Sequence, residues 1–175
     1  MYNPTSKTLP KYISKEEISS MLDKAKKDRY RNYVLLLTLS RTGLRVSELV
    51  KLRKSDVSEN TILVRQGKGK KDRVVPLESE LSSLLGLYVD SKSPRDRLFP
   101  LTDRQVRNIV YKYAPDGLDV HPHTLRHSFA VHCLKSGMNV RSLQKILGHS
   151  SLTTTQVYLD VIGKDVSDDF GKVVW

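Results

Sequence analysis

The segment HPHTLRHSF, residues 121–129, carries side chains suited to acid and base chemistry on an anion. If a helix begins near His123, then His123 and Arg126 lie three residues apart and share one face of that helix. The imidazole can accept a proton, and the guanidinium can hold two oxygens of an oxyanion. The pair therefore indicates a site for a phosphate.

The same segment also matches a metal-binding spacing, HxxxH, through His123 and His127. We expect no metal, because Thr124 stands where the HExxH pattern has glutamate, and no Cys or carboxylate cluster accompanies the pair. His127 lies beside Leu125 and Phe129 on the expected helix. We therefore predict that His127 supports its neighbours and takes no direct part in catalysis.

A second set of phosphate ligands is predicted in RTGLRVSEL, residues 41–49. Gly43 allows a tight turn, and Arg45 follows it at the start of a short helix. The guanidinium and the helix N-terminus could then hold phosphate oxygens together. Glu48, about one turn further on, is expected to hold Arg45 in place. The alternative is an ordinary surface ion pair of small energetic value.

A basic, glycine-flanked tip is predicted for the hairpin that contains QGKGKKDRVVPL, residues 66–77. Lys68 is the best candidate for a general acid, because neighbouring cations can lower the pKa of a lysine enough for it to donate a proton near neutral pH. The alternative is a hairpin that only contacts the DNA backbone. The candidates for such contacts are Lys70, Lys71 and Arg73.

The segment LGHSSLTTTQVYLD, residues 147–160, contributes a glycine, a histidine and a tyrosine. Gly148 is suited to ending one helix with a left-handed turn, which holds His149 in the junction before the next helix. Tyr158 falls at the flank of the buried face of that next helix, where its hydroxyl can point into a cleft. A tyrosine is a weak nucleophile unless a base and nearby cations assist its ionisation. The alternative is a tyrosine that only packs.

Helical periodicity covers most of the chain and predicts the scaffold that positions these segments. Ser14 and Glu17 form a capping-box pattern at the start of the first helix. Only residues 61–66 and 73–77 follow a strand pattern, around a loop with two glycines. We therefore expect an α+β fold, mainly α with a small antiparallel β-sheet. The expected helices cover, approximately, residues 15–27, 30–41, 45–52, 78–90, 103–113, 123–136, 139–147 and 151–162.

The length and composition fit one packed domain, since the 175 residues are 38% hydrophobic and 28% charged. We expect residues 1–13 to be a linker, 14–163 the folded domain and 164–175 a tail that docks on its own domain or on a neighbouring protomer. No stretch approaches the roughly 20 apolar residues of a membrane span, and the N-terminus lacks the apolar core of a signal peptide. A single cysteine, Cys133, agrees with a reducing compartment. The expectation is a soluble, cytoplasmic protein with no membrane partner.

The charge balance points to a polyanionic partner. Thirty Lys and Arg residues against nineteen Asp and Glu residues give a formal net charge of +11 at pH 7. Such a potential attracts nucleic acid, although an ordinary basic protein is the alternative.

The order of these segments resembles the catalytic signature of the tyrosine recombinase or phage integrase family, especially its Xer-like members. That order is Arg, then Lys on a hairpin, then HxxRH, then GH with a Tyr nine positions after the His. The resemblance implies the catalytic-domain fold of these DNA breaking and rejoining enzymes, acting on double-stranded DNA as a dimer or tetramer and associated with the nucleoid. It runs through LPKYISKEEI, TGLRVSELVKL, GKGKKDRVVPL, HPHTLRHSFAVHCLKSG and LQKILGHSSLTTTQVYLDV.

The resemblance also implies a role for each matching residue. Tyr158 attacks the scissile phosphodiester and forms a 3′-phosphotyrosyl link, which releases a 5′-hydroxyl and needs neither metal nor ATP as a cofactor. By the same resemblance, Arg45, Arg126 and His149 stabilise the transition state. His123 would act as the base toward the tyrosine, and Lys68 as the acid toward the leaving oxygen.

The chain departs from the family in one respect, because complete members usually carry an N-terminal helical domain that closes around DNA. We therefore expect an isolated catalytic domain or a short member, whose DNA binding is weak and strongly dependent on salt. Three alternative functions stay open. They are a DNA-binding module that is inactive without an N-terminal partner domain, a type IB topoisomerase, and a metal-dependent nuclease.

Overall fold

The computed structural model of the protein describes residues 11–65, 71–149, 158 and 163. Most of the expected linker, the hairpin tip, most of the expected helix 151–162 and the tail 164–175 lie outside the described residues. The elements are, in chain order, α1 (Lys15–Asp28), α2 (Tyr30–Thr42), α3 (Val46–Leu49), the 3-10 helix η1 (Lys54–Asp56), β1 (Val57–Ser58), β2 (Thr61–Val64), β3 (Arg73–Pro76), α4 (Ser79–Val89), α5 (Asp103–Tyr113), α6 (Pro122–Lys135) and α7 (Val140–Leu147).

Local capping residues explain where several helices begin and end. The Ser14 hydroxyl accepts a hydrogen bond from the Glu17 N–H at 3.1 Å, and the Glu17 carboxylate accepts one from the Ser14 N–H at 2.6 Å. Helix α1 therefore begins with the predicted capping box. Gly43 and Gly148 end α2 and α7 with φ angles of 62° and 66°, the left-handed conformation that glycine adopts without strain.

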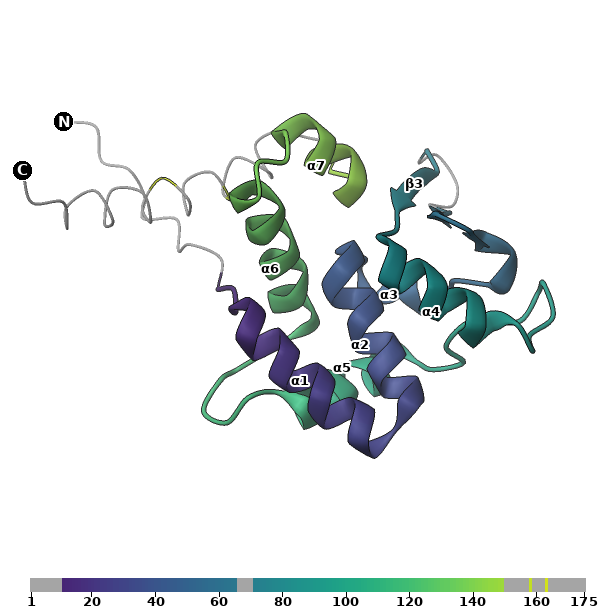
Figure 1. Cartoon of the computed structure of the whole chain (residues 1–175), viewed down its shortest axis with the longest axis horizontal. Coiled ribbons are helices and arrows are strands. Elements are labelled where there is room, and N and C mark those ends of the chain that lie inside the picture. Colours follow the sequence, from purple (N-terminus) through teal and green to yellow (C-terminus); the bar gives the residue numbers. More distant parts are fainter. Residues whose placement is uncertain (1–10, 66–70, 150–157, 159–162, 164–175) are drawn as a thin grey trace, which may run out of the picture.

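Helix α2 forms the centre of the main hydrophobic core. Every residue from Asn32 to Ser40 is buried. The helix contacts α1, α4 and α6, and Figure 1 shows it between α6 and α4. Because neighbours cover it on several sides, α2 carries apolar side chains around most of its circumference, as a core helix requires.

Within the described residues, three strands form one antiparallel sheet in the order β1-β2-β3. Ile62 pairs with Val75, and Val64 pairs with Arg73. These four side chains are buried, whereas Val74 is exposed, so β3 alternates between the two faces of the sheet. The sequence predicted β2 and β3 but not β1, because two residues are too few to show an alternating pattern. Strand β3 contacts α7, as Figure 1 also shows.

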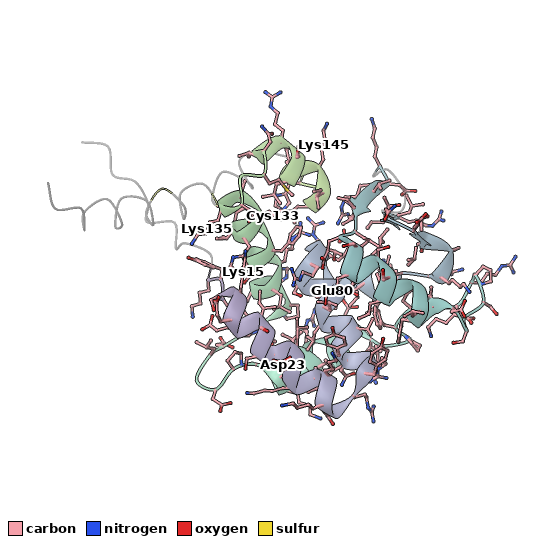
Figure 2. All side chains as sticks on the ribbon, in the orientation of Figure 1. Lys15, Asp23, Glu80, Cys133, Lys135 and Lys145 are labelled. Carbon is pink, nitrogen blue, oxygen red and sulfur yellow. The ribbon has the colours of Figure 1, made fainter. Side chains whose placement is uncertain are left out.

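A smaller core cluster joins α6 and α7 to Tyr158. Leu143 and Leu147 of α7 are fully buried in it. Cys133, which Figure 2 labels on α6, packs against the same cluster. Burial raises the pKa of the Cys133 thiol to about 11, so the thiol is protonated and unreactive at neutral pH.

The prediction of a mainly helical α+β fold with a small antiparallel sheet is confirmed.

The described helices are short compared with the thickness of a bilayer. None of those in the described ranges is long and apolar enough to cross a membrane.

Candidate active site

The turn between α2 and α3 brings α6 and α7 against the end of α2. A Cβ atom added to Gly43 would lie 2.5 Å from Cδ1 of Phe129 on α6 and 2.8 Å from Cδ2 of Leu147 on α7. The Gly43 carbonyl also accepts a hydrogen bond from Nη1 of Arg126. Only glycine satisfies both the positive φ and this close packing. The turn therefore places Arg45, two residues later, on the wall of the cavity that Arg126 also lines.

Glu48 holds Arg45, as the sequence predicts, and also holds a second arginine. Its carboxylate lies 3.1 Å from Nη1 of Arg45 and accepts the Arg45 backbone N–H at 2.8 Å. The same carboxylate accepts two hydrogen bonds of 2.8 Å from Arg73. Burial alone would raise the pKa of Glu48, but the hydrogen bonds from Arg73 and from the Arg45 backbone outweigh burial and lower it. The carboxylate therefore stays ionised and fixes both guanidinium groups.

Arg73, which the sequence predicts as a contact to the DNA backbone, is directed into the fold. Its side chain is only 8% exposed, and its Nε donates to the Ile146 carbonyl at 2.7 Å while Nη1 and Nη2 bind Glu48. The physical reason is strand register, because Arg73 pairs with Val64 and shares the buried face of the sheet. Arg73 therefore ties the hairpin to α3 and α7 from the inside.

Of the three lysines predicted to act from the hairpin, the structure describes only Lys71. Lys71 is exposed, as a contact to the DNA backbone requires. Lys68, the candidate acid, and Lys70 both lie outside the described residues. Their predicted roles stay predictions.

Arg126 is buried and bound from three directions. Its Nη2 donates to the Leu147 carbonyl at 2.7 Å and to Nε2 of His149 at 3.0 Å, in addition to the bond from Nη1 to Gly43. Burial, with a contribution from the charge of Arg45, lowers the pKa of Arg126 to about 10. The guanidinium is therefore still charged at neutral pH, and its orientation is fixed before any substrate binds.

His149 is a neutral imidazole at neutral pH. Burial, followed by the charge of Arg126, lowers its pKa to about 4. Because an arginine can only donate, Nε2 of His149 must accept the hydrogen bond from Arg126, which leaves the proton on Nδ1. The left-handed turn at Gly148 sets this geometry, and it is the turn that the sequence predicts.

Tyr158 is buried and hydrogen-bonded to a histidine. It has a helical backbone, the residue is only 3% exposed, and its hydroxyl lies 2.9 Å from Nδ1 of His127. Burial raises its pKa, and the charges of Arg126 and Arg45 oppose that effect. The phenol is therefore protonated at neutral pH. The sequence predicted a supporting role for His127, but its contact with Tyr158 is set by packing between residues 31 positions apart.

One cavity of about 320 Å³ brings several of the predicted residues together. Arg45, His123 and Arg126 all line it. His123 is exposed, and its pKa is lowered first by burial of part of the ring and then by the charge of Arg126. His123 is therefore mainly unprotonated at neutral pH and can accept a proton. Arg107 of α5 lines the same cavity, and the sequence analysis did not select it.

The two histidines of the HxxxH spacing have ring centroids 6.5 Å apart. Among the residues that the structure describes, no group of three or more His, Cys, Asp or Glu side chains could hold a metal ion. The cavity instead gathers guanidinium and imidazole groups, which suit an anionic ligand.

The low pKa of His149 predicts a pH dependence of stability. The folded chain titrates His149 near pH 4, whereas the ordinary value is 6.5. Between these values the unfolded chain binds more protons than the folded chain, so the free energy of unfolding falls as the pH falls from 6.5 toward 4. The His149→Gln variant should lose part of this dependence, which urea unfolding at about pH 7 and about pH 5 would measure.

The other histidines with lowered pKa values do not affect this comparison between the wild type and the His149→Gln variant. His123, His127 and His132 also have lowered pKa values, but they titrate in both proteins. The difference between the two proteins therefore isolates His149. Equal loss of stability on acidification in both proteins would show that His149 is not protonated on unfolding.

The phage integrase family matches residues 11–163 of this chain. A tyrosine recombinase of Pseudothermotoga lettingae is 43% identical over 177 residues, which cover 95% of this chain and 62% of the relative. The chain therefore spans less than two thirds of the length of that relative.

Two solved structures share the arrangement of helices and strands. The crystal structure of XerA recombinase matches with a TM-score of 0.81 at 33% identity, over 98% of this chain and 68% of that one. A XerH site-specific recombinase, solved in a post-cleavage complex with a palindromic difH substrate, matches with a TM-score of 0.76 at 25% identity, over 97% of this chain and 55% of that one.

Proposed function

The chain belongs to the phage integrase family of tyrosine recombinases, and from this premise we propose that it cleaves and rejoins double-stranded DNA at specific sites. One observation carries the proposal. Arg45 is about eighty residues away from His123 and Arg126 in the sequence, yet all three line a single cavity of about 320 Å³. A phosphodiester in this cavity would meet two charged donors and a proton acceptor.

The proposed cleavage exchanges one phosphate ester for another. The Tyr158 oxygen attacks the phosphorus, and the bond between phosphorus and the 5′ oxygen breaks as the bond to tyrosine forms. The phenol proton passes to His123, and the leaving 5′ oxygen takes a proton from Lys68. Attack by a 5′-hydroxyl of another strand reverses these steps. Because the phosphotyrosyl link retains the energy of the broken ester, rejoining needs no ATP.

The donors of the site are arranged for the negative charge that develops during this exchange. Arg45 is held in place by Glu48, and Arg126 is held by backbone carbonyls. His149 is neutral, with its proton on Nδ1 as a further donor near Arg126. Donors that are oriented in advance stabilise a transition state by several kcal/mol each, because they need not reorganise during the reaction.

Tyr158 has to move before it attacks. Its hydroxyl is bound to His127, and Tyr158 is not among the described residues that line the cavity. We infer that binding of DNA replaces this hydrogen bond with contacts to the phosphate. The same observation favours a second candidate function, a DNA-binding module whose tyrosine stays withdrawn until a partner domain is present.

DNA as a partner is supported by the net charge of +11 and by the cations of the cavity. Self-association on DNA, as a dimer or tetramer, is part of the same proposal, because exchange between two duplexes needs more than one active site. Cytoplasmic, nucleoid-associated action follows from this choice of partner.

The experiment that tests the function traps the covalent intermediate. Duplexes with a nick beside a randomised central sequence lose the short strand after cleavage, so the adduct accumulates. We expect a protein band shifted by DNA on a denaturing gel in the presence of EDTA, with the DNA mapped to the peptide that contains Tyr158. Cleavage that requires a divalent metal and leaves no covalent adduct would instead support a nuclease.

A Tyr158 that stays bound to His127, and does not reach the DNA, would give a different result in this experiment. DNA binding without an adduct on any sequence would support the DNA-binding module. Adding the N-terminal region of a relative to the same assay would then show whether Tyr158 can form the adduct when that region is present. Strand exchange between two differently labelled duplexes separates recombination from topoisomerase activity.

A further inference from the structure

One wall of the cavity is a stripe along helix α5. Asp103, Arg107 and Tyr111 follow each other at intervals of four residues, so they lie on one face of the helix, and all three line the cavity. Eight residues of α-helix rise about 12 Å. Successive phosphates of one DNA strand follow at about 3.4 Å along the helix axis. The wall is therefore longer than a single phosphate needs.

Arg107 differs from the other two arginines of the cavity. Arg45 is bound by Glu48, and Arg126 is bound by backbone carbonyls and His149. Arg107 is exposed, and its side chain makes neither a hydrogen bond nor an ion pair with any other residue that the structure describes. Asp103 lies one turn before it without an ion pair between them in the described structure. Arg107 thus retains its full capacity to donate to a ligand.

The end of the cavity beside Arg107 is built from groups that already have partners. The Tyr111 hydroxyl lies 2.7 Å from Nδ1 of His121, and Nε2 of His121 lies 3.0 Å from the carboxylate of Asp119. If Nε2 donates to Asp119, then Nδ1 accepts the hydroxyl proton of Tyr111. These groups shape the wall, and the charged donor at this end is Arg107.

We propose that Arg107 holds a second phosphate of the DNA strand, next to the phosphate that Arg45 and Arg126 hold. This inference rests on the proposed function and adds a binding subsite to it. The subsite positions the strand along the cavity and takes no part in breaking the ester bond. Arg107 lies close enough to the reacting groups for its charge to contribute to the lowered pKa of His123, after burial and the charges of Arg126 and Arg45.

Two small probes test the subsite without knowledge of the target sequence. Thymidine 3′,5′-bisphosphate carries two phosphates one nucleoside apart, and thymidine 5′-monophosphate carries one. We expect the wild-type chain to bind the bisphosphate about tenfold more tightly, since a charge-assisted hydrogen bond is worth at least this factor. The Arg107→Gln variant should bind the two probes with similar affinity. Titration followed by NMR chemical shifts measures both dissociation constants.

Arg104 provides the matched control. It is an exposed arginine on the same helix that does not line the cavity. The Arg104→Gln variant removes the same charge and should keep the preference for the bisphosphate. An unchanged preference in Arg107→Gln, an equal loss in both variants, or the absence of binding by both probes would overturn the inference.

The probes separate this inference from the proposed function, because they involve no cleavage. If the chain forms the covalent DNA adduct but shows no Arg107-dependent preference for the bisphosphate, the subsite is rejected and the proposed function stands. An Arg107-dependent preference in a chain that forms no adduct would reject the proposed reaction and leave a site for two phosphates.

Discussion

The Tyr158→Phe variant is expected to form no covalent DNA adduct, with cleavage of a nicked duplex reduced by at least about 10⁴-fold. Phenylalanine keeps the ring that packs between α6 and α7, so the fold is retained, but it removes the attacking oxygen. Loss of the hydrogen bond to His127 should cost about 0.5–1.5 kcal/mol of unfolding free energy. DNA binding should remain close to that of the wild type, as measured by fluorescence anisotropy.

The matched control for this variant is Tyr30→Phe. Tyr30 is 51% exposed on α2, and the same hydroxyl is removed there from a tyrosine outside the candidate site. The control should form the adduct at the wild-type rate. An adduct with the Tyr158→Phe protein would mean that another residue is the nucleophile, and peptide mapping of that adduct would identify it.

Replacing Glu48 with alanine is expected to cost about 3–5 kcal/mol of unfolding free energy, a large share of the roughly 5–15 kcal/mol typical of a folded domain. The variant leaves the guanidinium of Arg73 buried without its counter-charge, and it frees Arg45 to leave the cavity wall. Adduct formation should therefore fall together with stability. Urea unfolding measures the first effect, and the nicked-duplex assay at low temperature measures the second.

An exposed ion pair gives the comparison for Glu48. Asp116 lies 3.5 Å from Lys24, and both side chains are largely exposed. The Asp116→Ala variant should lose less than about 1 kcal/mol, because solvent screens such pairs. Similar losses in both variants would contradict the importance of burial at Glu48.

Helix boundaries were predictable because local chemistry sets them. The Ser14–Glu17 capping box begins α1, and the bounds predicted for α5, residues 103–113, agree with the structure. Strand β1 was missed, because its two residues form a strand only through pairing with β2. Local patterns specify elements that are stable through neighbouring residues, and they do not specify elements that depend on a distant partner.

The candidate site was predictable in its residue types and less so in its contacts. The turn at Gly43, the ion pair between Arg45 and Glu48, and the turn at Gly148 all act over a few residues, and the sequence predicts each of them. Asp103, Arg107 and Tyr111 share one helical face through their spacing of four residues, but they were not predicted as site residues. Nothing in the sequence indicated that this face lines the cavity, since that depends on how α5 packs against α3.

Long-range packing decided the remaining contacts. In sequence Arg73 is one of several hairpin cations, yet strand register buries it against Glu48, 25 residues away. Tyr158 was proposed from the sequence as the nucleophile, yet folding places its hydroxyl against His127, and Tyr158 is not among the described residues that line the cavity. The chain encodes which groups are available for chemistry, whereas burial and register determine the partner, the charge state and the direction of each group. These depend on residues that no local pattern joins.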